Sequence, residues 1–284
     1  MNSRESVALV TGASSGIGKA IAIRLVEAGY RVYGTSRRGA QDSRQLFEML
    51  PLDVTSDASV EAAITELLRL HGRIDVLVNN AGFGVAPAGA EESSIEQAKA
   101  IFETNFFGLV RMTRAVLPHM RRQESGRIIN ISSVVGFLPA PYGALYAATK
   151  HAVEGYSESL DHEVRTKGIR VSLIEPAYTK THFDANLLAA DSTLEVYRGM
   201  GAHVEKALSD AITKGDAPSV VADVVLKAAT AARPKVRYTA GSLAGKLRLI
   251  RRFAPAGLID AALRKDLGLD TPAASQPRIH AVER

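Results

Sequence analysis

The chain has 284 residues, of which 46% are apolar and 23% charged, a composition typical of a globular protein with a sizeable core. It contains no cysteine, which excludes disulfides, iron–sulfur clusters, thiolate metal sites and a cysteine nucleophile. The net charge of +5 comes from the C-terminal part, because residues 233–284 carry a net charge of +7 and the preceding residues −2.

The N-terminal residues are polar and lead directly into an apolar strand-like segment, without the hydrophobic region of a signal peptide. The chain also has no uninterrupted apolar run of about 18 residues, the length that a transmembrane helix needs. We therefore expect a soluble, cytoplasmic protein.

Short β-branched segments alternate with longer helical segments along the chain. Strands are predicted over Val7–Thr11, Arg31–Thr35, Met49–Leu52, Val76–Asn79, Arg127–Ser132, Arg170–Ile174 and Lys235–Tyr238. Helices are predicted over Ile17–Ala28, Ser59–His71, Ile95–Met120, Tyr146–Lys167 and Ser219–Ala232. This alternation is typical of βαβ units, and near-continuous apolar strands suit a sheet covered on both faces. The pattern predicts an α/β fold with a doubly wound, Rossmann-type sheet of seven parallel strands and helices on both faces.

No linker rich in glycine, serine or proline divides the chain, so residues 1–240 are predicted to form one domain. The segment Ala177–Met200 is too long for an ordinary connection and is predicted to be a lid over the substrate. Residues 241–284 are predicted to be a basic helical C-terminal extension. Its amphipathic helices cover Ser242–Phe253 and Ala256–Leu267, and a disordered end follows.

A glycine-rich turn with the sequence TGASSGIG follows the first strand at residues 11–18 and precedes a helix. Its spacing is G-x-x-x-G-x-G rather than G-x-G-x-x-G, but the physical reasoning is the same. Glycines let the backbone approach a pyrophosphate at a helix N-terminus, where N–H groups favour anions. A purely structural turn is the alternative. The predicted cofactor contacts here are Gly12, Ser14, Ser15, Gly16, Ile17 and Gly18.

The end of the second strand predicts which dinucleotide is bound. An NAD site usually has a carboxylate there, which holds the ribose 2′-hydroxyl. This chain has Ser36, Arg37 and Arg38 instead. Because guanidinium groups bind phosphate through two parallel hydrogen bonds, these residues predict NADP, with NADPH preferred over NADH. A solvated turn is the alternative interpretation of the two arginines.

Polar residues also follow the third and fourth strands. Asp53 and Val54 come after the third strand, and Asp53 either accepts from the adenine amino group or caps the next helix. Asn80, Ala81 and Gly82 follow the fourth strand at the edge where the sheet would face a cofactor, although a plain turn is the competing interpretation.

Tyr146 and Lys150 are four residues apart, so they share one face of a helix. An ammonium beside a phenol favours the phenolate, so Lys150 is predicted to lower the pKa of Tyr146 towards working pH. Ser133 follows the fifth strand and is predicted to hydrogen-bond a substrate oxygen. A Tyr–Lys pair alone is common on helices, but its combination with the glycine-rich turn and the serine favours catalysis.

These motifs resemble those of the short-chain dehydrogenase/reductase family. The matching segments, in order over residues 7–180, are TGASSGIG, NNAG at 79–82, TNFFG with Asn105, INISS at 129–133, YAATK at 146–150 and the segment at Pro176. The resemblance implies a tetrad in which Tyr146 is the acid/base and Ser133 positions the carbonyl oxygen. It also implies that Lys150 binds the nicotinamide ribose and tunes Tyr146, and that Asn105 holds a water linked to Lys150.

The chain departs from the family at Pro176-Ala177, where the family commonly has Pro-Gly. Thr179 and Thr181 remain candidate partners of the nicotinamide carboxamide. The middle and the C-terminal part of the chain, with KVRY at 235–238 and the arginine-rich helices, resemble the subgroup of 17β-hydroxysteroid and retinol dehydrogenases. The family resemblance implies a homodimer or homotetramer formed through the helices Ile95–Met120 and Tyr146–Lys167.

The predicted substrate is a hydrophobic small molecule on which a carbonyl and an alcohol are interconverted by hydride transfer. The predicted pocket and lid residues are apolar or aromatic: Phe137, Leu138, Tyr142, Phe183, Leu187, Leu188 and Tyr197. The alternative function is a non-catalytic dinucleotide-binding sensor or scaffold. Sugar-nucleotide epimerases and dehydratases share the Tyr–Lys pair, but their glycine spacing and longer substrate domain fit less well.

The seven histidines show no metal-binding spacing, so no catalytic metal is expected. The basic extension has three interpretations. Its helices pack their apolar faces near the substrate entrance, or they attach weakly to an anionic membrane surface. Nucleic-acid binding is not expected, because the rest of the chain is net acidic and contains no recognition motif.

Overall fold

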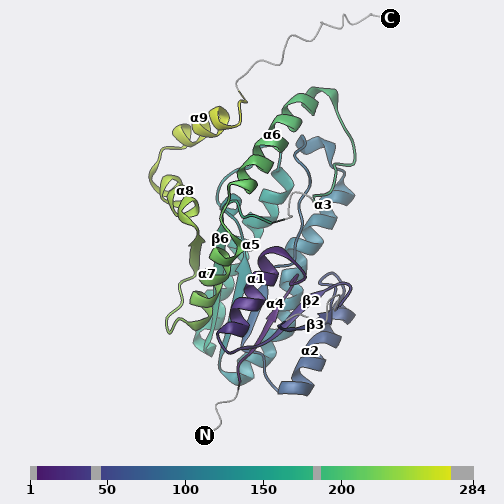
Figure 1. The fold of residues 1–284 in the computed structure, drawn as a ribbon, viewed down its shortest axis with the longest axis vertical. Helices are drawn as coiled ribbons and strands as arrows, with labels where there is room; N and C mark the ends of the chain where they lie inside the picture. The colour runs from purple at the N-terminus through teal and green to yellow at the C-terminus, as the bar shows by residue number, and fades with distance from the viewer. Residues whose placement is uncertain (1–4, 40–45, 182–186, 270–284) are drawn as a thin grey trace, which may run out of the picture.

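The computed structural model describes residues 5–39, 46–181 and 187–269 (Figure 1). Its core is a sheet of seven parallel strands in the order β3-β2-β1-β4-β5-β6-β7. The predicted doubly wound, Rossmann-type architecture is therefore confirmed. The strands are β1 (Val7–Val10), β2 (Arg31–Ser36), β3 (Glu48–Pro51), β4 (Val76–Asn79), β5 (Gly126–Ile131), β6 (Ile169–Pro176) and β7 (Arg237–Ala240).

Helices cover both faces of the sheet, as Figure 1 shows. Helices α1 and α7 pack on one face, and α2, α4 and α5 pack on the other. The helices are α1 (Gly16–Glu27), α2 (Asp57–His71), α3 (Ile95–Phe102), α4 (Gly108–Gln123), α5 (Ala144–Val164), α6 (Glu195–Thr213), α7 (Pro218–Thr230), α8 (Ser242–Phe253) and α9 (Ala256–Asp266).

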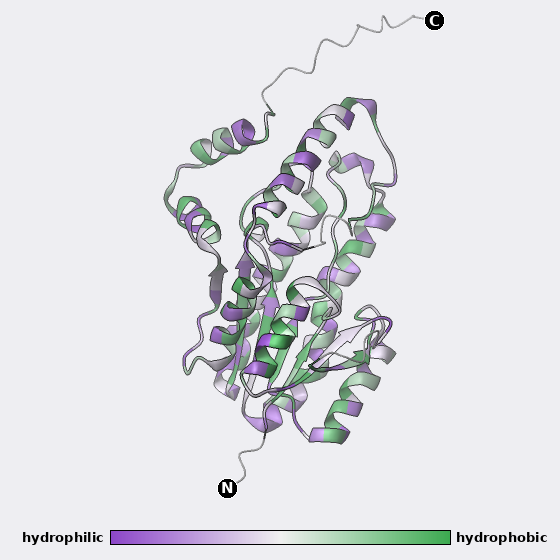
Figure 2. Cartoon of the chain, viewed as in Figure 1, coloured by the Kyte–Doolittle hydropathy of each residue, from purple (hydrophilic) through white to green (hydrophobic). Residues whose placement is uncertain are grey.

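The central strands form the core because their side chains are apolar on both faces. All four residues of β1 and of β4 are buried, and Figure 2 shows hydrophobic residues along the middle of the sheet. The chain runs outward from β1 through β2 to β3, and then returns to β4 on the other side of β1. This reversal leaves a crevice at the carboxyl ends of β1 and β4, the usual position of a ligand in such folds.

Two helical regions differ from the sequence prediction. The predicted helix Ile95–Met120 is divided by a π-helical turn, η2, over Glu103–Phe107. In the second region, α6 begins inside the predicted lid and continues to Thr213, whereas the sequence predicted no helix there. Only Gly201, Val204 and Ile212 of α6 are buried. Apolar residues nevertheless recur every four positions at Val196, Met200, Val204, Leu208 and Ile212, so the helical spacing was present and the sequence prediction overlooked it.

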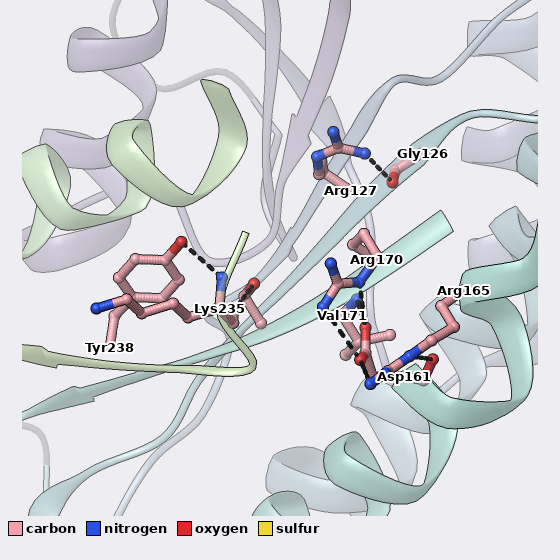
Figure 3. Close-up of polar contacts among 9 residues, drawn as sticks. Gly126, Arg127, Asp161, Arg165, Arg170, Val171, Lys235 and Tyr238 are labelled. Carbon is pink, nitrogen blue, oxygen red and sulfur yellow. Dashed lines mark hydrogen bonds and ion pairs between the residues drawn. The ribbon is translucent and has the colours of Figure 1, made fainter. Parts of the chain in front are cut away.

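A buried carboxylate joins α5 to β6 (Figure 3). Asp161 accepts hydrogen bonds from Arg165 at 2.5 Å, from Arg170 at 2.9 Å and from the Val171 backbone N–H at 2.9 Å. Although burial alone acts to raise its pKa, these donors hold the pKa of Asp161 below its ordinary value. The contacts fix the long helix that carries Tyr146 against the sheet.

The two C-terminal helices occupy the predicted ranges to within a residue, and Figure 1 shows them projecting from the side of the sheet beyond β7. The predicted disordered end lies outside the described residues. Within the described ranges, none of the helices combines the length and the hydrophobicity needed to span a membrane.

Candidate active site

The glycine-rich turn between β1 and α1 is close-packed against the turn after β4. Gly12 and Gly16 have positive φ angles of 65° and 55°, which favour glycine. A Cβ atom on Gly18 would lie 2.3 Å from the Gly12 carbonyl oxygen. The Asn80 amide donates to the Thr11 and Gly12 carbonyls at 3.0 and 3.1 Å. These positions therefore need glycine because of the close approach of two backbone segments.

The N-terminus of α1 can accept an anion. Ser15 is the N-cap residue, but its side chain makes no capping hydrogen bond, and the first turn contains no acidic residue. A groove beside this turn is lined by Gly16, Lys19, Lys180 and Thr181 among other residues. Free helix N–H groups next to two ammonium groups suit a pyrophosphate. The predicted residues Ser14 and Ile17 lie on the same turn.

The end of β2 carries two exposed cations. Arg37 and Arg38 are exposed, and within the described residues neither forms an ion pair. The Ser36 hydroxyl donates to the Gly39 carbonyl at 3.0 Å, which closes the turn that presents them. A ribose 2′-phosphate would find two guanidinium groups here.

Asp53 does not cap α2, so that alternative is wrong. Ser56 caps the helix and accepts from the Ser59 backbone N–H, whereas Asp53 accepts from the backbone and hydroxyl of Thr55 at 2.9 and 2.8 Å. These hydrogen bonds lower the pKa of Asp53, so it stays an anionic acceptor. Val54 is buried against Gly108, where a Cβ atom would meet its Cγ2 at 2.7 Å.

The side chain of Asn80 supports the glycine-rich turn, and the backbone N–H groups of Asn80 and Ala81 both donate to the Thr11 hydroxyl, at 2.9 and 3.0 Å. Gly82 leaves room for Asn105, since a Cβ there would lie 2.9 Å from Asn105 Oδ1. The Asn80 side-chain amide nitrogen is engaged inside the turn, and the role of Asn80 in cofactor binding stays a prediction. Thr11 is a residue that the sequence analysis did not assign, although it begins the TGASSGIG motif.

Asn105 lies in the π-helical turn, a feature frequent at functional sites. It is buried, its Oδ1 accepts from the Phe83 N–H at 2.9 Å, and its Nδ2 donates to the Phe83 carbonyl at 2.8 Å. Nδ2 also lies 3.3 Å from the Thr149 hydroxyl, which donates to the Tyr146 carbonyl at 2.7 Å. Asn105 thus connects the loop after β4 to the helix that carries Tyr146 and Lys150.

Tyr146 and Lys150 lie together on the first two turns of α5. The Lys150 ammonium donates to the Ile131 carbonyl at 2.9 Å and lies 5.5 Å from the centre of the Tyr146 ring. Burial lowers the pKa of Lys150 to about 8. Burial also raises the pKa of Tyr146 above its ordinary value. The predicted lowering of the Tyr146 pKa is therefore wrong for the protein by itself, because loss of solvent outweighs the attraction of an ammonium positioned over the ring face.

Ser133 follows β5 in an extended backbone conformation, and its hydroxyl accepts from the Val135 N–H at 3.3 Å. Tyr146 lies in the first turn of α5, the next long element, so both side chains come from the carboxyl edge of the sheet. The arrangement brings a hydroxyl, a phenol and an ammonium to the edge that also carries the glycine-rich turn.

A small apolar cavity adjoins Tyr146. It lies between residues 85–93 and Tyr142, which has a φ angle of 63°. Tyr197 of α6 packs edge-on against Tyr142, with ring centres 6.2 Å apart, and donates to Glu91 at 2.7 Å. Of the predicted pocket residues, Tyr142 and Tyr197 therefore meet beside the candidate acid/base.

The described part of the predicted lid is hydrogen-bonded to the segment 84–92, which lines the cavity beside Tyr146. Leu188 exchanges backbone hydrogen bonds with Gly84 and Ala86, and Leu194 donates from its N–H to Glu92 at 2.6 Å. Leu187 lies next to this pairing and is partly buried. Phe183 lies outside the described residues.

Of the other two predicted pocket residues, Phe137 lies beside the C-terminal extension. Leu138 is buried, and the Phe137 ring lies under the Arg248 guanidinium at 5.5 Å.

Pro176 ends β6, and the segment after it packs beside the glycine-rich turn. The backbones of Tyr178 and Lys180 pair with Asp216, and Thr179 is buried. Thr181 lies where a Cβ on Gly16 would touch its Cγ2 at 3.4 Å. The structure thus brings Thr181 to the phosphate end of the crevice.

In the ranges that the structure describes, no group of three or more histidine, aspartate or glutamate side chains could hold a metal ion.

The fold and this edge of the sheet define a dinucleotide-dependent oxidoreductase. The family model described as short chain dehydrogenase matches residues 6–192, well over half of the chain. The chain belongs to the short-chain dehydrogenase/reductase family.

Among curated relatives, 3-ketodihydrosphingosine reductase of Bacteroides thetaiotaomicron is 46% identical over 180 residues, which are 63% of this chain. The match spans 66% of that enzyme, slightly under two thirds of its length. Retinol dehydrogenase 8 of Bos taurus is 34% identical over 272 residues, 88% of this chain and 86% of that protein.

Solved structures of short-chain dehydrogenases and reductases share the fold of this chain. A short-chain dehydrogenase from Streptomyces avermitilis superposes with a TM-score of 0.80 at 32% identity, covering 95% of this chain and all of that one. A metagenomic short-chain oxidoreductase in complex with NADP has a TM-score of 0.64 at 30% identity (82% and 96% covered). A Brucella melitensis 3-ketoacyl-(acyl-carrier-protein) reductase complexed with NADH has a TM-score of 0.70 at 27% identity (84% and 97% covered). The neighbours thus include both NADP and NADH complexes.

Proposed function

We propose that the protein is an NADPH-preferring reductase of a hydrophobic ketone or aldehyde. The observation that carries the proposal is the position of Tyr146, with the Lys150 ammonium over its ring and an apolar cavity beside it, at the sheet edge that also holds the glycine-rich turn.

The residues present fit a dinucleotide. The close approach at Gly18 and the uncapped N-terminus of α1 suit a pyrophosphate, and Arg37 and Arg38 suit a 2′-phosphate. When bound, the nicotinamide supplies or accepts the hydride.

In this mechanism Tyr146 donates its phenolic proton to the carbonyl oxygen, and Ser133 donates a hydrogen bond to the same oxygen as it gains negative charge. Lys150 stabilises the phenolate that remains. Its pKa of about 8 keeps it largely protonated at neutral pH. Asn105 keeps the first turns of α5 in place through Phe83 and Thr149.

The substrate class rests on the described walls of the cavity, which include Val85, Ala86, Ala88 and Tyr142 and, among the described residues, no charged side chain. Such walls accept apolar chains or rings better than sugars. The 46% identity to a 3-ketodihydrosphingosine reductase supports a long-chain β-keto compound as one member of the substrate panel.

The test is oxidation of NADPH and NADH by the purified protein with a panel of aliphatic, aryl, steroid, retinoid and long-chain β-keto carbonyls. Turnover with NADPH that falls at least about 1,000-fold in Tyr146→Phe supports the mechanism, because the variant keeps the ring but loses the proton. Turnover of sugars only would contradict the apolar substrate class. Cofactor binding without turnover on any carbonyl would favour the sensor or scaffold function.

We also propose that the C-terminal extension touches an anionic lipid surface. Leu249, Phe253 and Leu258 are 60%, 72% and 64% exposed, and Lys246 and Lys265 are exposed on the same helices. Apolar and basic side chains together favour an anionic interface. Flotation with phosphatidylserine vesicles that is lost in Leu249→Ser/Phe253→Ser would support this, whereas equal flotation of both proteins, or none, would contradict it.

For the assembly we propose a homodimer or homotetramer through α3, α4 and α5, in the cytoplasm. Ile95 and Phe107 support this interface, since they are 66% and 48% exposed on the α3–α4 segment. The absence of cysteine is consistent with a reducing compartment. Light scattering of the wild type and Phe107→Ser tests the assembly, and a monomeric wild type would contradict it.

A further inference from the structure

A cluster of buried charges lies between the catalytic helix and the C-terminal extension. Glu154 of α5 and Glu175 of β6 are 4% and 0% exposed. Arg237 of β7 pairs with both carboxylates, at 2.9 Å from Glu175, and with the more exposed Glu158 at 2.6 Å. Arg248 of α8 pairs with Glu175 at 2.5 Å. Two deeply buried carboxylates thus depend on two guanidinium groups.

The cluster touches the elements that carry the catalytic side chains. Glu154 lies one turn after Lys150 on α5, and its negative charge acts to raise the Lys150 pKa against burial. Glu154 also packs on the turn after β5: a Cβ on Gly136 would meet Ser132 Oγ at 2.7 Å and Glu154 Cγ at 3.0 Å. Ser133 lies between Ser132 and Gly136 in the chain. Glu154 therefore packs against the turn that carries the serine and also lies one helical turn from the lysine.

Charge balance explains why Arg248 is needed. Burial raises the pKa of Glu154, and the Glu175 charge acts in the same direction, whereas Ser132, Arg237 and Arg248 oppose it. Without Arg248, the Arg237 guanidinium would have to balance all three carboxylates of this cluster. A buried carboxylate that loses its partner takes up a proton or disrupts its surroundings.

We propose that Arg248 is a positioning residue of the catalytic centre, through which α8 holds the Glu154–Glu175 cluster against Lys150 and the Ser132–Gly136 turn. The proposal rests on the reductase activity proposed above. The C-terminal extension is then part of the active site's support.

The experiment compares Arg248→Met with Arg252→Met, which removes the same charge from the same helix outside the cluster. We expect Arg248→Met to move the acid limb of the kcat–pH profile about one pH unit upward. Below that limb kcat falls about tenfold, because the ionised fraction of Glu154 falls tenfold per unit. The KM for NADPH and the profile of Arg252→Met stay as in the wild type. Glu175→Gln/Arg248→Met removes one charge of each sign, and we expect its limb to return towards the wild-type position.

A second readout needs no substrate. In protein labelled with [δ-13C]glutamate, the Glu154 resonance, assigned from Glu154→Gln, reports its titration midpoint. If the Glu154 titration midpoint shifts upward in Arg248→Met but the wild type turns over no carbonyl, the result contradicts the proposed function and still supports the dependence of Glu154 on Arg248. Turnover with an unshifted midpoint and profile would overturn the proposal. A lower melting temperature alone, with unchanged titration, would show Arg248 to be only structural and would overturn it as well.

Discussion

Gly18 provides the sharpest test of the glycine-rich turn. A Cβ atom at this position would lie 2.3 Å from the Gly12 carbonyl oxygen and 2.5 Å from the Asn80 amide nitrogen, both inside van der Waals contact. Asn80 at the same point donates to the Thr11 and Gly12 carbonyls. Gly18→Ala therefore forces the turn and the β4 loop apart.

The cost can be worked from these contacts. Two lost hydrogen bonds cost about 1 kcal/mol each, and the overpacking costs about 1–3 kcal/mol. We expect the free energy of unfolding to fall by about 3–5 kcal/mol. Relief of the contact needs a shift of about 1 Å, since carbon atoms pack at roughly 3.5 Å. A displacement of that size also moves the N–H groups of the turn that would hold a pyrophosphate, so we expect the protein to bind NADPH more weakly.

Urea unfolding and NADPH fluorescence titration measure the two effects. The control is Gly199→Ala in α6, because nothing lies within 4 Å of a Cβ there. Alanine should stabilise this exposed helical position by about 0.5–1 kcal/mol and leave NADPH affinity unchanged. Wild-type stability and affinity in Gly18→Ala would refute the argument from close approach.

Two further predictions concern charge. Arg37→Ala/Arg38→Ala should lower kcat/KM for NADPH by about 10–100-fold, since hydrogen bonds to charged groups contribute about 1.5–3 kcal/mol. The value for NADH should hardly change, and equal losses for both cofactors would contradict a 2′-phosphate site. Asp161→Asn should lower stability by about 3 kcal/mol at pH 7. Because the native pKa of Asp161 is depressed, this difference should shrink in urea titrations as pH falls below about 4; a constant difference would contradict it.

The sequence pattern was sufficient to predict the positions of the strands, because the central strands are buried on both faces and form short apolar runs. All seven strands lie within two residues of their predicted positions. The π-helical turn could not be predicted, since apolar spacing continues through Phe102, Phe106 and Phe107 as it would in an uninterrupted helix. Helix α6 could have been predicted, since its apolar residues recur every four positions from Val196 to Ile212, a spacing that the sequence prediction overlooked.

The candidate site could be predicted as far as chain order determines position. Residues that follow parallel strands share one edge, so the motifs after β1, β2, β4 and β5 meet there. Side-chain direction was not predictable. The Asn80 side-chain amide donates to the Gly12 carbonyl, 68 residues away in the chain, and the Tyr146 pKa depends on how deeply the ring is buried. The spacing of residues along the sequence reveals neither the hydrogen-bond partner nor the depth of burial.

The orientation of α8 follows from the charge that it covers. An amphipathic helix usually turns its apolar face to the protein, yet here Arg248 pairs with buried Glu175 and Arg251 donates to the Phe137 carbonyl at 3.0 Å. Leu249 and Phe253 consequently stay exposed. Burying Glu175 without a second cation would cost more than exposing a few apolar side chains, since an unpaired buried charge costs several kcal/mol and an exposed leucine about 2. The same ion pair that stabilises the cluster beside Lys150 therefore also produces the apolar surface of the extension.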